Sequence, residues 1–188
     1  MSTVRKLLEA YLEAKDLDRP QLILDCYAPD AVLTFSIATD SISFPQRVRG
    51  ADAIARTLVR DFRKTFTLCK TYYVRDPVGD KPHGIQMLPW LVIMRESAGP
   101  TLRIGKGYYD WHFQSHKRAM RVRAMHIHIE RMDAIEDNNG TILNTLQSEL
   151  PYPWLSPAKL REVLESLMDR APAFAFLESF KIPVGRQG

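Results

Sequence analysis

Hydrophobic and polar residues alternate most clearly in residues 101–132 of the sequence. A period of two is typical of a β-strand, because alternate side chains point to opposite faces of a sheet. The first part of this segment is rich in Tyr, Trp and Phe. In the second part, the residues at every other position are Val122, Ala124, His126 and His128. The pattern predicts two long strands joined by a polar turn at residues 114–118.

The position of this turn decides which residues of the two strands face each other. A turn centred near His116 predicts these cross-strand pairs: Trp111 with Val122, Tyr109 with Ala124, and Gly107 with His126. We expect this aromatic face to line a cavity and the other face to carry an ion pair between Asp110 and Arg123. A slip of one residue would exchange the faces and turn Asp110 inward in place of His126.

Four segments repeat apolar residues with the spacing of an amphipathic helix: residues 4–12, 22–27, 54–62 and 160–168. Three more segments, residues 31–36, 68–74 and 85–96, have the composition of strands. The last of these is apolar on both faces, so something must cover each side. Pro89 within it lacks an N–H for the strand ladder, which predicts a sheet edge or a bulge.

Helices followed by long antiparallel strands predict an α+β fold. We expect a strongly bent, mostly antiparallel sheet with the N-terminal helices across its concave face. A cavity at the wide end of such a sheet is where a ligand would bind. We expect residues 1–145 to form this domain and residues 146–188 to form a C-terminal helical extension packed on it.

Composition and charge narrow the classes of function. The chain has 188 residues, of which 45% are apolar and 26% charged, which is typical of one soluble domain with a real core. The net charge of +4 and its scattered basic residues argue against nucleic-acid binding. No apolar run approaches the ~20 residues of a membrane helix, and the charged N-terminus lacks the core of a secretion signal. We therefore expect a cytoplasmic protein with no membrane partner, in which Cys26 and Cys69 are buried hydrophobes.

Several short motifs follow one another along the chain: AYLEAKDLD at residues 10–18, YAPDAV at 27–32, RGADAI at 49–54, and GYYD at 107–110 followed by MRV at 120–122. Together they resemble the nuclear transport factor 2-like (NTF2-like) superfamily, and within it the SnoaL-like domains. The resemblance extends to about residue 135. It implies a cone-shaped, cystatin-like domain that is usually a homodimer through the outer face of its sheet.

The resemblance implies no single function, because relatives include isomerases, dehydratases, an epoxide hydrolase, cyclases, non-catalytic dioxygenase subunits and transport factors. Compared with ketosteroid isomerase, Tyr11 takes the place of the tyrosine that donates to the oxyanion. Phe35 and Trp111 stand where the two aspartates of that enzyme would fall. Compared with scytalone dehydratase, Tyr72 replaces a catalytic histidine. These specific activities are therefore not expected.

We predict Tyr11 and His126 as catalytic residues, with Tyr11 donating to an oxyanion and His126 moving the proton. The alternatives are a core tyrosine and a structural histidine. His126 and His128 share a face, but a metal site would need a third ligand, so we expect no metal and no cofactor. The residues expected to form the wall of the ligand site are Phe35, Tyr72, Trp90, Tyr109, Trp111 and His128.

Two functions remain open. The first is a small-molecule-binding protein, acting as a cofactor-independent isomerase, cyclase or dehydratase on an apolar substrate that bears a carbonyl group. The second is a non-catalytic binding or assembly module. A cavity of roughly 300–1,000 Å³ with converging polar groups favours the first function, and a filled cavity with a large interface favours the second.

Overall fold

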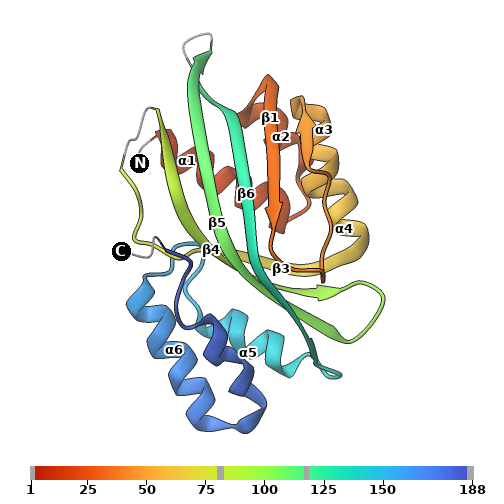
Figure 1. The fold of residues 1–188 in the computed structure, drawn as a ribbon, viewed down its shortest axis with the longest axis vertical. Coiled ribbons are helices and arrows are strands. Elements are labelled where there is room, and N and C mark those ends of the chain that lie inside the picture. The colour runs from red at the N-terminus through yellow and green to blue at the C-terminus, as the bar shows by residue number, and fades with distance from the viewer. Residues whose placement is uncertain (1–2, 80–82, 117–118, 186–188) are drawn as a thin grey trace.

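The computed structural model describes residues 3–79, 83–116 and 119–185 and confirms the predicted α+β fold (Figure 1). Its sheet has six strands in the order β2-β1-β6-β5-β4-β3, and β1 and β6 are its parallel pair. The strands are β1 Tyr27–Ile37, β2 Arg47–Arg49, β3 Phe66–Tyr73, β4 Gly84–Glu96, β5 Thr101–His116 and β6 Ala119–Glu136. The predicted hairpin is therefore the pair β5 and β6, at the centre of the sheet.

N-terminal helices cover one face of this sheet, which we call the inner face (Figure 1). They are α1 Thr3–Asp16, α2 Pro20–Cys26 and one continuous helix made of α3 Ala51–Ala55, the π-helical segment η1 Arg56–Asp61 and α4 Phe62–Thr65. The apolar stripe of α1 packs against inner-face residues such as Tyr109 and Met125 in the main core. Burial of this stripe is the main stabilising term for these short helices.

The C-terminal segment packs on the opposite, outer face of the sheet. It consists of α5 Thr141–Glu149, α6 Pro157–Arg170 and the 3-10 helix η2 Pro172–Phe180. Its apolar residues form a second core with Leu91, Ile93 and Ile104 of the sheet. The alternate residues of β4, Trp90 and Val92, lie in the first core. The prediction that both faces of β4 are covered is therefore confirmed. Helix α5 runs across residue 145, where we expected the boundary between the domain and its C-terminal extension.

Two bulges in β6 set the register of the central hairpin. His112 pairs with Ala124 and Phe113 with Val122, which leaves Arg123 as an extra residue. Glu130 is extra in the same way, between the partners of Lys106 and Gly107. A classic-type extra residue turns the following side chains to the other face. The pairing also starts one residue later than predicted, since His116 pairs with Ala119. The predicted pairs are therefore wrong; the observed partners are Met125 for Trp111, Ile127 for Tyr109, Ile129 for Gly107 and His126 for Asp110.

A third bulge lies in β4, near Pro89 as predicted. The register shifts between Ile85 and Leu88, and Met87 adopts a positive φ of 52°. Asp110 stabilises this bulge, since its Oδ1 accepts a hydrogen bond from the Met87 backbone N–H at 2.8 Å. The predicted ion pair of Asp110 with Arg123 is wrong, because the bulge at Arg123 removes it from the ladder and leaves it exposed. Across the described part of the chain, no helix is long and apolar enough to span a membrane.

Candidate functional site

A small cavity of about 50 Å³ lies between the inner face of the sheet and the N-terminal helices. Most of its wall is apolar, and the residues that line it are Tyr11, Lys15, Phe35, Ile42, Phe44, Leu58, Phe62, Trp90, Val92, Met94, Tyr109, Ile127, Ile129 and Met132. This inner cavity has room for one or two water-sized groups, since a water takes up roughly 30 Å³ of liquid. Its chemistry therefore depends on the few polar groups in the wall.

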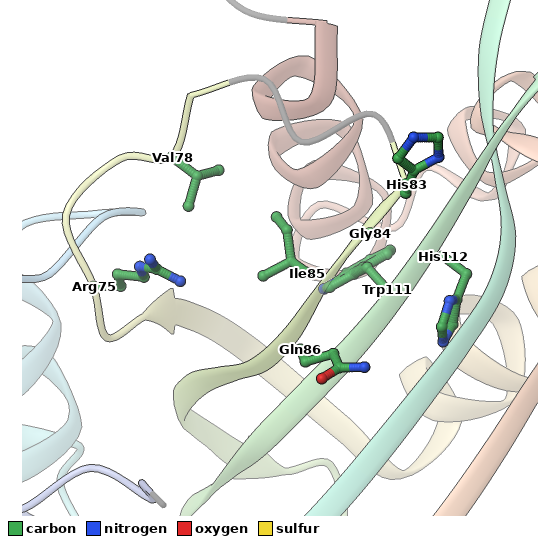
Figure 2. A pocket seen from close by; sticks show the side chains of 8 residues that line it. All are labelled: Arg75, Val78, His83, Gly84, Ile85, Gln86, Trp111 and His112. Atoms are coloured by element: carbon green, nitrogen blue, oxygen red, sulfur yellow. The ribbon is translucent and has the colours of Figure 1, made fainter.

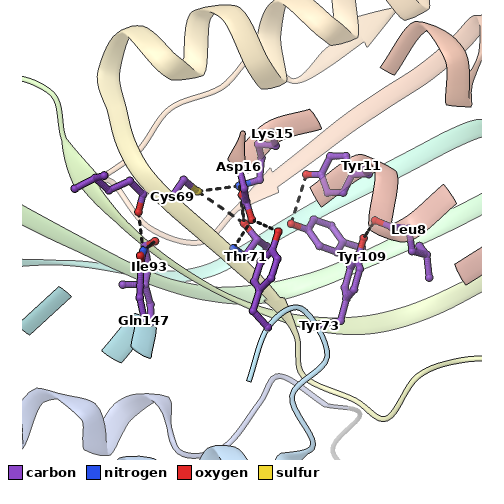
Figure 3. Close-up of polar contacts among 12 residues, drawn as sticks. Leu8, Tyr11, Lys15, Asp16, Cys69, Thr71, Tyr73, Ile93, Tyr109 and Gln147 are labelled. Atoms are coloured by element: carbon purple, nitrogen blue, oxygen red, sulfur yellow. Dashed lines mark hydrogen bonds and ion pairs between the residues drawn. The ribbon is translucent and has the colours of Figure 1, made fainter. Parts of the chain in front are cut away.

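Two phenols, those of Tyr11 and Tyr109, meet at this wall (Figure 3). Tyr11 comes from α1 and Tyr109 from β5, and the Tyr11 hydroxyl donates to the Tyr109 oxygen at a long 3.5 Å. Both side chains are buried, and burial raises the pKa of Tyr11 to about 12 and that of Tyr109 well above its usual value. Both phenols are therefore neutral donors at neutral pH.

The indole of Trp90 also lines the inner cavity. It stacks on Tyr109 with ring centroids 5.6 Å apart. Its Nε1–H is buried and has no hydrogen-bond partner within the described residues. Buried donors are almost always paired, so an orphan donor beside a cavity indicates a missing acceptor such as a water or a ligand.

A buried ion pair between Lys15 and Asp16 (Figure 3) reaches the inner cavity through Lys15, which lines it. The Lys15 ammonium contacts Asp16 Oδ1 at 3.0 Å, Cys69 Sγ at 3.2 Å and Thr71 Oγ1 at 2.6 Å. Burial lowers the pKa of Lys15, but the nearby Asp16 carboxylate opposes this effect and the net pKa is raised. Burial also raises the pKa of the Cys69 thiol to about 12, so this thiol is protonated and unreactive.

The Asp16 carboxylate is saturated with hydrogen bonds. Besides Lys15, it accepts from the Thr71 hydroxyl at 3.0 Å and the Thr71 backbone N–H at 2.7 Å. The Tyr152 hydroxyl, from the connector between α5 and α6, donates to its Oδ2 at 3.1 Å. Four donors occupy the two oxygens of this carboxylate, which leaves it little capacity to accept a further hydrogen bond from a ligand. The arrangement therefore positions Lys15 at the cavity wall more than it prepares Asp16 for proton abstraction.

The structure brings most of the predicted site residues together. Tyr11, Phe35, Trp90 and Tyr109 line the inner cavity. Trp111 belongs to the same core, with its ring 5.2 Å from that of Tyr11. The sequence could predict this group because the alternation of the strands places their side chains on one face of the sheet, and the helical spacing places Tyr11 on the apolar stripe of α1.

Three predicted residues lie elsewhere. Tyr72 is on the outer face, in the core beneath the C-terminal helices. His126 and His128 also lie on the outer face, because the bulge at Arg123 reverses the alternation on which their placement rested. The prediction that the two imidazoles share a face with Trp111 is therefore wrong, and His126 is not in reach of the inner cavity as a proton shuttle.

The two histidines instead form a polar chain with β1. The Ser36 hydroxyl lies 2.8 Å from His126 Nε2 and 2.7 Å from His128 Nδ1, and Thr34 lies 2.8 Å from His126 Nδ1. Ser36 has one proton, so it donates to one imidazole and accepts from the other. Tyr108 stacks on His128 with centroids 4.7 Å apart. Among the described residues, no group of three His, Cys, Asp or Glu side chains is arranged to hold a metal.

Sequence reasoning missed Lys15, Asp16 and Thr71 as members of the site. A signal for Lys15 was present, since it continues the apolar stripe of α1 one turn after Tyr11. A charged residue in a buried stripe needs a partner, which indicates a site. The contact with Thr71 depends on how α1 crosses β3, which no local pattern in the sequence specifies.

Comparisons place this architecture among proteins of known structure, although no protein-family model and no curated protein matches the sequence. LinA is similar with a TM-score of 0.55 and 10% identity, over 71% of this chain and 87% of that one. An NTF2-like superfamily protein from Salmonella enterica has a TM-score of 0.52 and 14% identity, over 66% and 86% of the chains. A putative scytalone dehydratase from Novosphingobium aromaticivorans has a TM-score of 0.51 and 12% identity, over 73% and 91%. The chain therefore has the NTF2-like fold, as the sequence motifs indicated.

Proposed function

We propose that the inner cavity binds a small molecule with an apolar body and one hydrogen-bond acceptor, such as a carbonyl oxygen. The observation that carries this proposal is the surplus of donors at the cavity wall. Tyr11 and Tyr109 share one long hydrogen bond, and the Trp90 indole N–H has no partner in the described structure. An acceptor placed among these groups would satisfy them, and the apolar wall would bind the rest of the ligand.

One structural neighbour supports the apolar part of this ligand class. LinA is a hexachlorocyclohexane dehydrochlorinase, and its name identifies a small apolar substrate. In this chain, Tyr11 would stabilise negative charge on the acceptor oxygen, because a neutral phenol in a water-excluded site is an effective donor to an oxyanion. We do not assign a proton-moving role to His126, since its imidazole lies on the other side of the sheet.

Binding requires the cavity to widen. Its volume of about 50 Å³ is below the roughly 300–1,000 Å³ of typical ligand sites. Ile42 and Phe44, from the segment between β1 and β2, form part of the wall and are half-buried. Phe44 stacks on Phe35 with centroids 4.7 Å apart. Displacement of these two side chains would open the cavity without disturbing the sheet.

The three tryptophans provide the test. We would titrate the 15N-labelled protein with cyclohexanone and follow the indole N–H signals by NMR, with methylenecyclohexane as a ligand of similar shape that lacks the acceptor oxygen. Cyclohexanone should shift the Trp90 signal, and Tyr11→Phe should weaken its binding about fivefold to tenfold. Trp154 is the internal control, because its indole N–H donates to Glu9 at 2.6 Å outside the cavity. Equal binding of the two ligands, or no shift of Trp90, would refute the proposal.

The nearly filled cavity also favours a second candidate, an assembly module that forms a homodimer through the outer face. The C-terminal helices cover the part of this face near Leu91 and Ile104. The part around Ser36, Tyr108 and His128 is half-buried in the single chain. If this part forms the interface, Tyr108→Asp should convert a dimer to a monomer in sedimentation velocity. A monomeric wild-type protein would exclude this role.

A further inference from the structure

The connector between α5 and α6, residues 150–156, crosses the free edge of the sheet at the end of β3. Strand β3 ends at Tyr73, and the chain then continues through Arg75 around the edge of β4 (Figure 2). The Tyr73 backbone N–H donates to the Pro153 oxygen at 2.9 Å, and the Leu155 N–H donates to the Tyr73 oxygen at 2.9 Å. These backbone hydrogen bonds fix the connector to the sheet without the help of its side chains.

Two side chains of the connector bind helix α1. The Trp154 indole N–H donates to Glu9 at 2.6 Å. The Tyr152 hydroxyl donates to Asp16 Oδ2 at 3.1 Å. The two acceptors are about two helical turns apart on α1, and Tyr11, which lines the inner cavity, lies between them. The C-terminal segment therefore holds the part of α1 that faces the inner cavity.

The hydroxyl of Tyr152 completes the hydrogen bonding of the Asp16 carboxylate. Oδ1 of this carboxylate accepts from Lys15 and from the Thr71 hydroxyl. Oδ2 accepts from the Thr71 backbone N–H and from Tyr152. The Asp16 side chain is only 1% exposed, so bulk water does not reach it to replace a lost donor. Without the Tyr152 hydroxyl, we expect the carboxylate to rotate toward its remaining donors and to displace the Lys15 ammonium.

Lys15 acts on the inner cavity through its charge. Its three N–H groups are all used, by Asp16, Cys69 and Thr71, so it has no free donor for a ligand. Burial raises the pKa of the Tyr11 phenol, and the positive charge of Lys15 opposes this effect. A more acidic phenol is a stronger hydrogen-bond donor to an oxygen that carries negative charge. The position of Lys15 therefore affects how well Tyr11 binds an acceptor.

We propose that Tyr152 is a positioning residue of the inner cavity. Through its hydroxyl, the C-terminal segment holds Asp16 and Lys15 in place and keeps the Tyr11 phenol an effective donor. This inference rests on the proposed function of the inner cavity and extends it to a part of the chain that lies beyond the NTF2-like sequence motifs. The C-terminal segment is then part of the ligand site as well as a cover for the outer face of the sheet.

The first measurement needs no ligand. We would record the side-chain ammonium signal of Lys15 by 15N NMR and assign it with Lys15→Met. Tyr152→Phe removes only the hydroxyl and should shift this signal, while the Trp154 indole signal stays in place because the connector remains on α1. Tyr108→Phe is the matched control, since it removes the same group from a half-buried tyrosine on the outer face. An unchanged Lys15 signal in Tyr152→Phe would overturn the proposal, as would an equal change at Trp154, which would indicate a detached connector.

The second measurement is the cyclohexanone titration followed at Trp90. Tyr152→Phe should weaken binding about threefold, less than Tyr11→Phe because its effect is indirect, and Tyr108→Phe should leave the affinity unchanged. The double variant Tyr11→Phe, Tyr152→Phe should bind no more weakly than Tyr11→Phe alone, because Tyr152 acts through the Tyr11 hydroxyl. Additive losses would overturn the positioning role. If the wild type does not bind cyclohexanone, the proposed function fails, whereas the Lys15 signal still decides whether Tyr152 positions the ion pair.

Discussion

The inner and outer faces of the sheet use the same strands but differ in how their polar groups are handled. On the inner face, polar groups are few and deeply buried, and the Lys15–Asp16 pair is surrounded by partners. On the outer face, the chain from Thr34 to His128 is half-buried and adjustable, because its proton positions can change. The comparison indicates that the inner face supplies a fixed environment, whereas the outer face can respond to conditions.

The largest expected effect concerns the buried Lys15–Asp16 ion pair on the inner face. If this environment is fixed, loss of one charge should strongly destabilise the fold. Asp16→Ala should destabilise the fold by about 3–5 kcal/mol, because it leaves the Lys15 ammonium buried without its counter-charge. Urea denaturation would measure the change. Lys15→Met combined with Asp16→Ala should recover part of the loss, since removing both charges also removes their desolvation cost. A double variant no more stable than Asp16→Ala would show that the two charges act independently.

Alkaline pH should destabilise the inner face through the buried phenol of Tyr11. Burial raises the pKa of Tyr11 from 10.0 to about 12, so the folded state favours the neutral phenol. The corresponding stabilisation is fully present below pH 10 and is lost as the pH rises from 10 through about 12, because the unfolded chain releases the proton first. The loss attributable to this residue is up to about 2–3 kcal/mol. Denaturation curves at pH 8, 10 and 11 would measure it, and Tyr11→Phe should show a shallower decline than the wild type.

Two glycines of β5 test how tightly the inner face is packed. A Cβ at Gly107 would lie 1.9 Å from the His128 backbone oxygen and 2.6 Å from the Trp90 ring. Gly107→Ala should therefore cost about 1–3 kcal/mol, through displacement of the backbone or the indole. Gly105→Ala is the matched comparison, because its closest contact is the flexible end of Met132. Equal melting temperatures for the two variants would contradict this account of the packing.

The sequence predicted the helices, the long central strands and the α+β class because each follows from a repeat of apolar residues. It also predicted Tyr11, Phe35, Trp90 and Tyr109 as neighbours, and all four line the inner cavity. It failed at the histidines because one extra residue at Arg123 reverses the faces of the residues between it and the second bulge at Glu130. A bulge has no strong local signature, since it depends on which strand pairs alongside. The short strand β2 and helix α5 were missed for a similar reason, because tertiary contacts more than periodicity stabilise them.

The smallest expected effect concerns acid pH and the outer face. Burial lowers the pKa of His128, and nearby His126 lowers it further, while Glu130 and Asp110 oppose the shift. The associated stability is present above the unfolded pKa of about 6.5 and is lost as the pH falls through the lower folded value. When His128 is protonated, its Nδ1–H donates to the Ser36 oxygen. The Ser36 hydroxyl must then donate to His126 Nε2, which therefore has to stay unprotonated. Protonation of one histidine thus disfavours protonation of the other.

This coupling predicts that Ser36→Ala changes the two histidine titrations together. In the wild type, NMR titration of the imidazole signals should show His128 gaining its proton at a lower pH than the usual pKa of about 6.5 for histidine. In Ser36→Ala, the shared hydroxyl is absent, so the His126 and His128 titrations should become more independent of each other. The melting temperature should decline only slightly between pH 7.5 and 5, because the side chain of His128 is half-buried and solvent partly screens its charge. If the His126 and His128 curves are the same in both proteins, the Ser36 hydroxyl does not couple them, and the outer face is no more adjustable than the inner one.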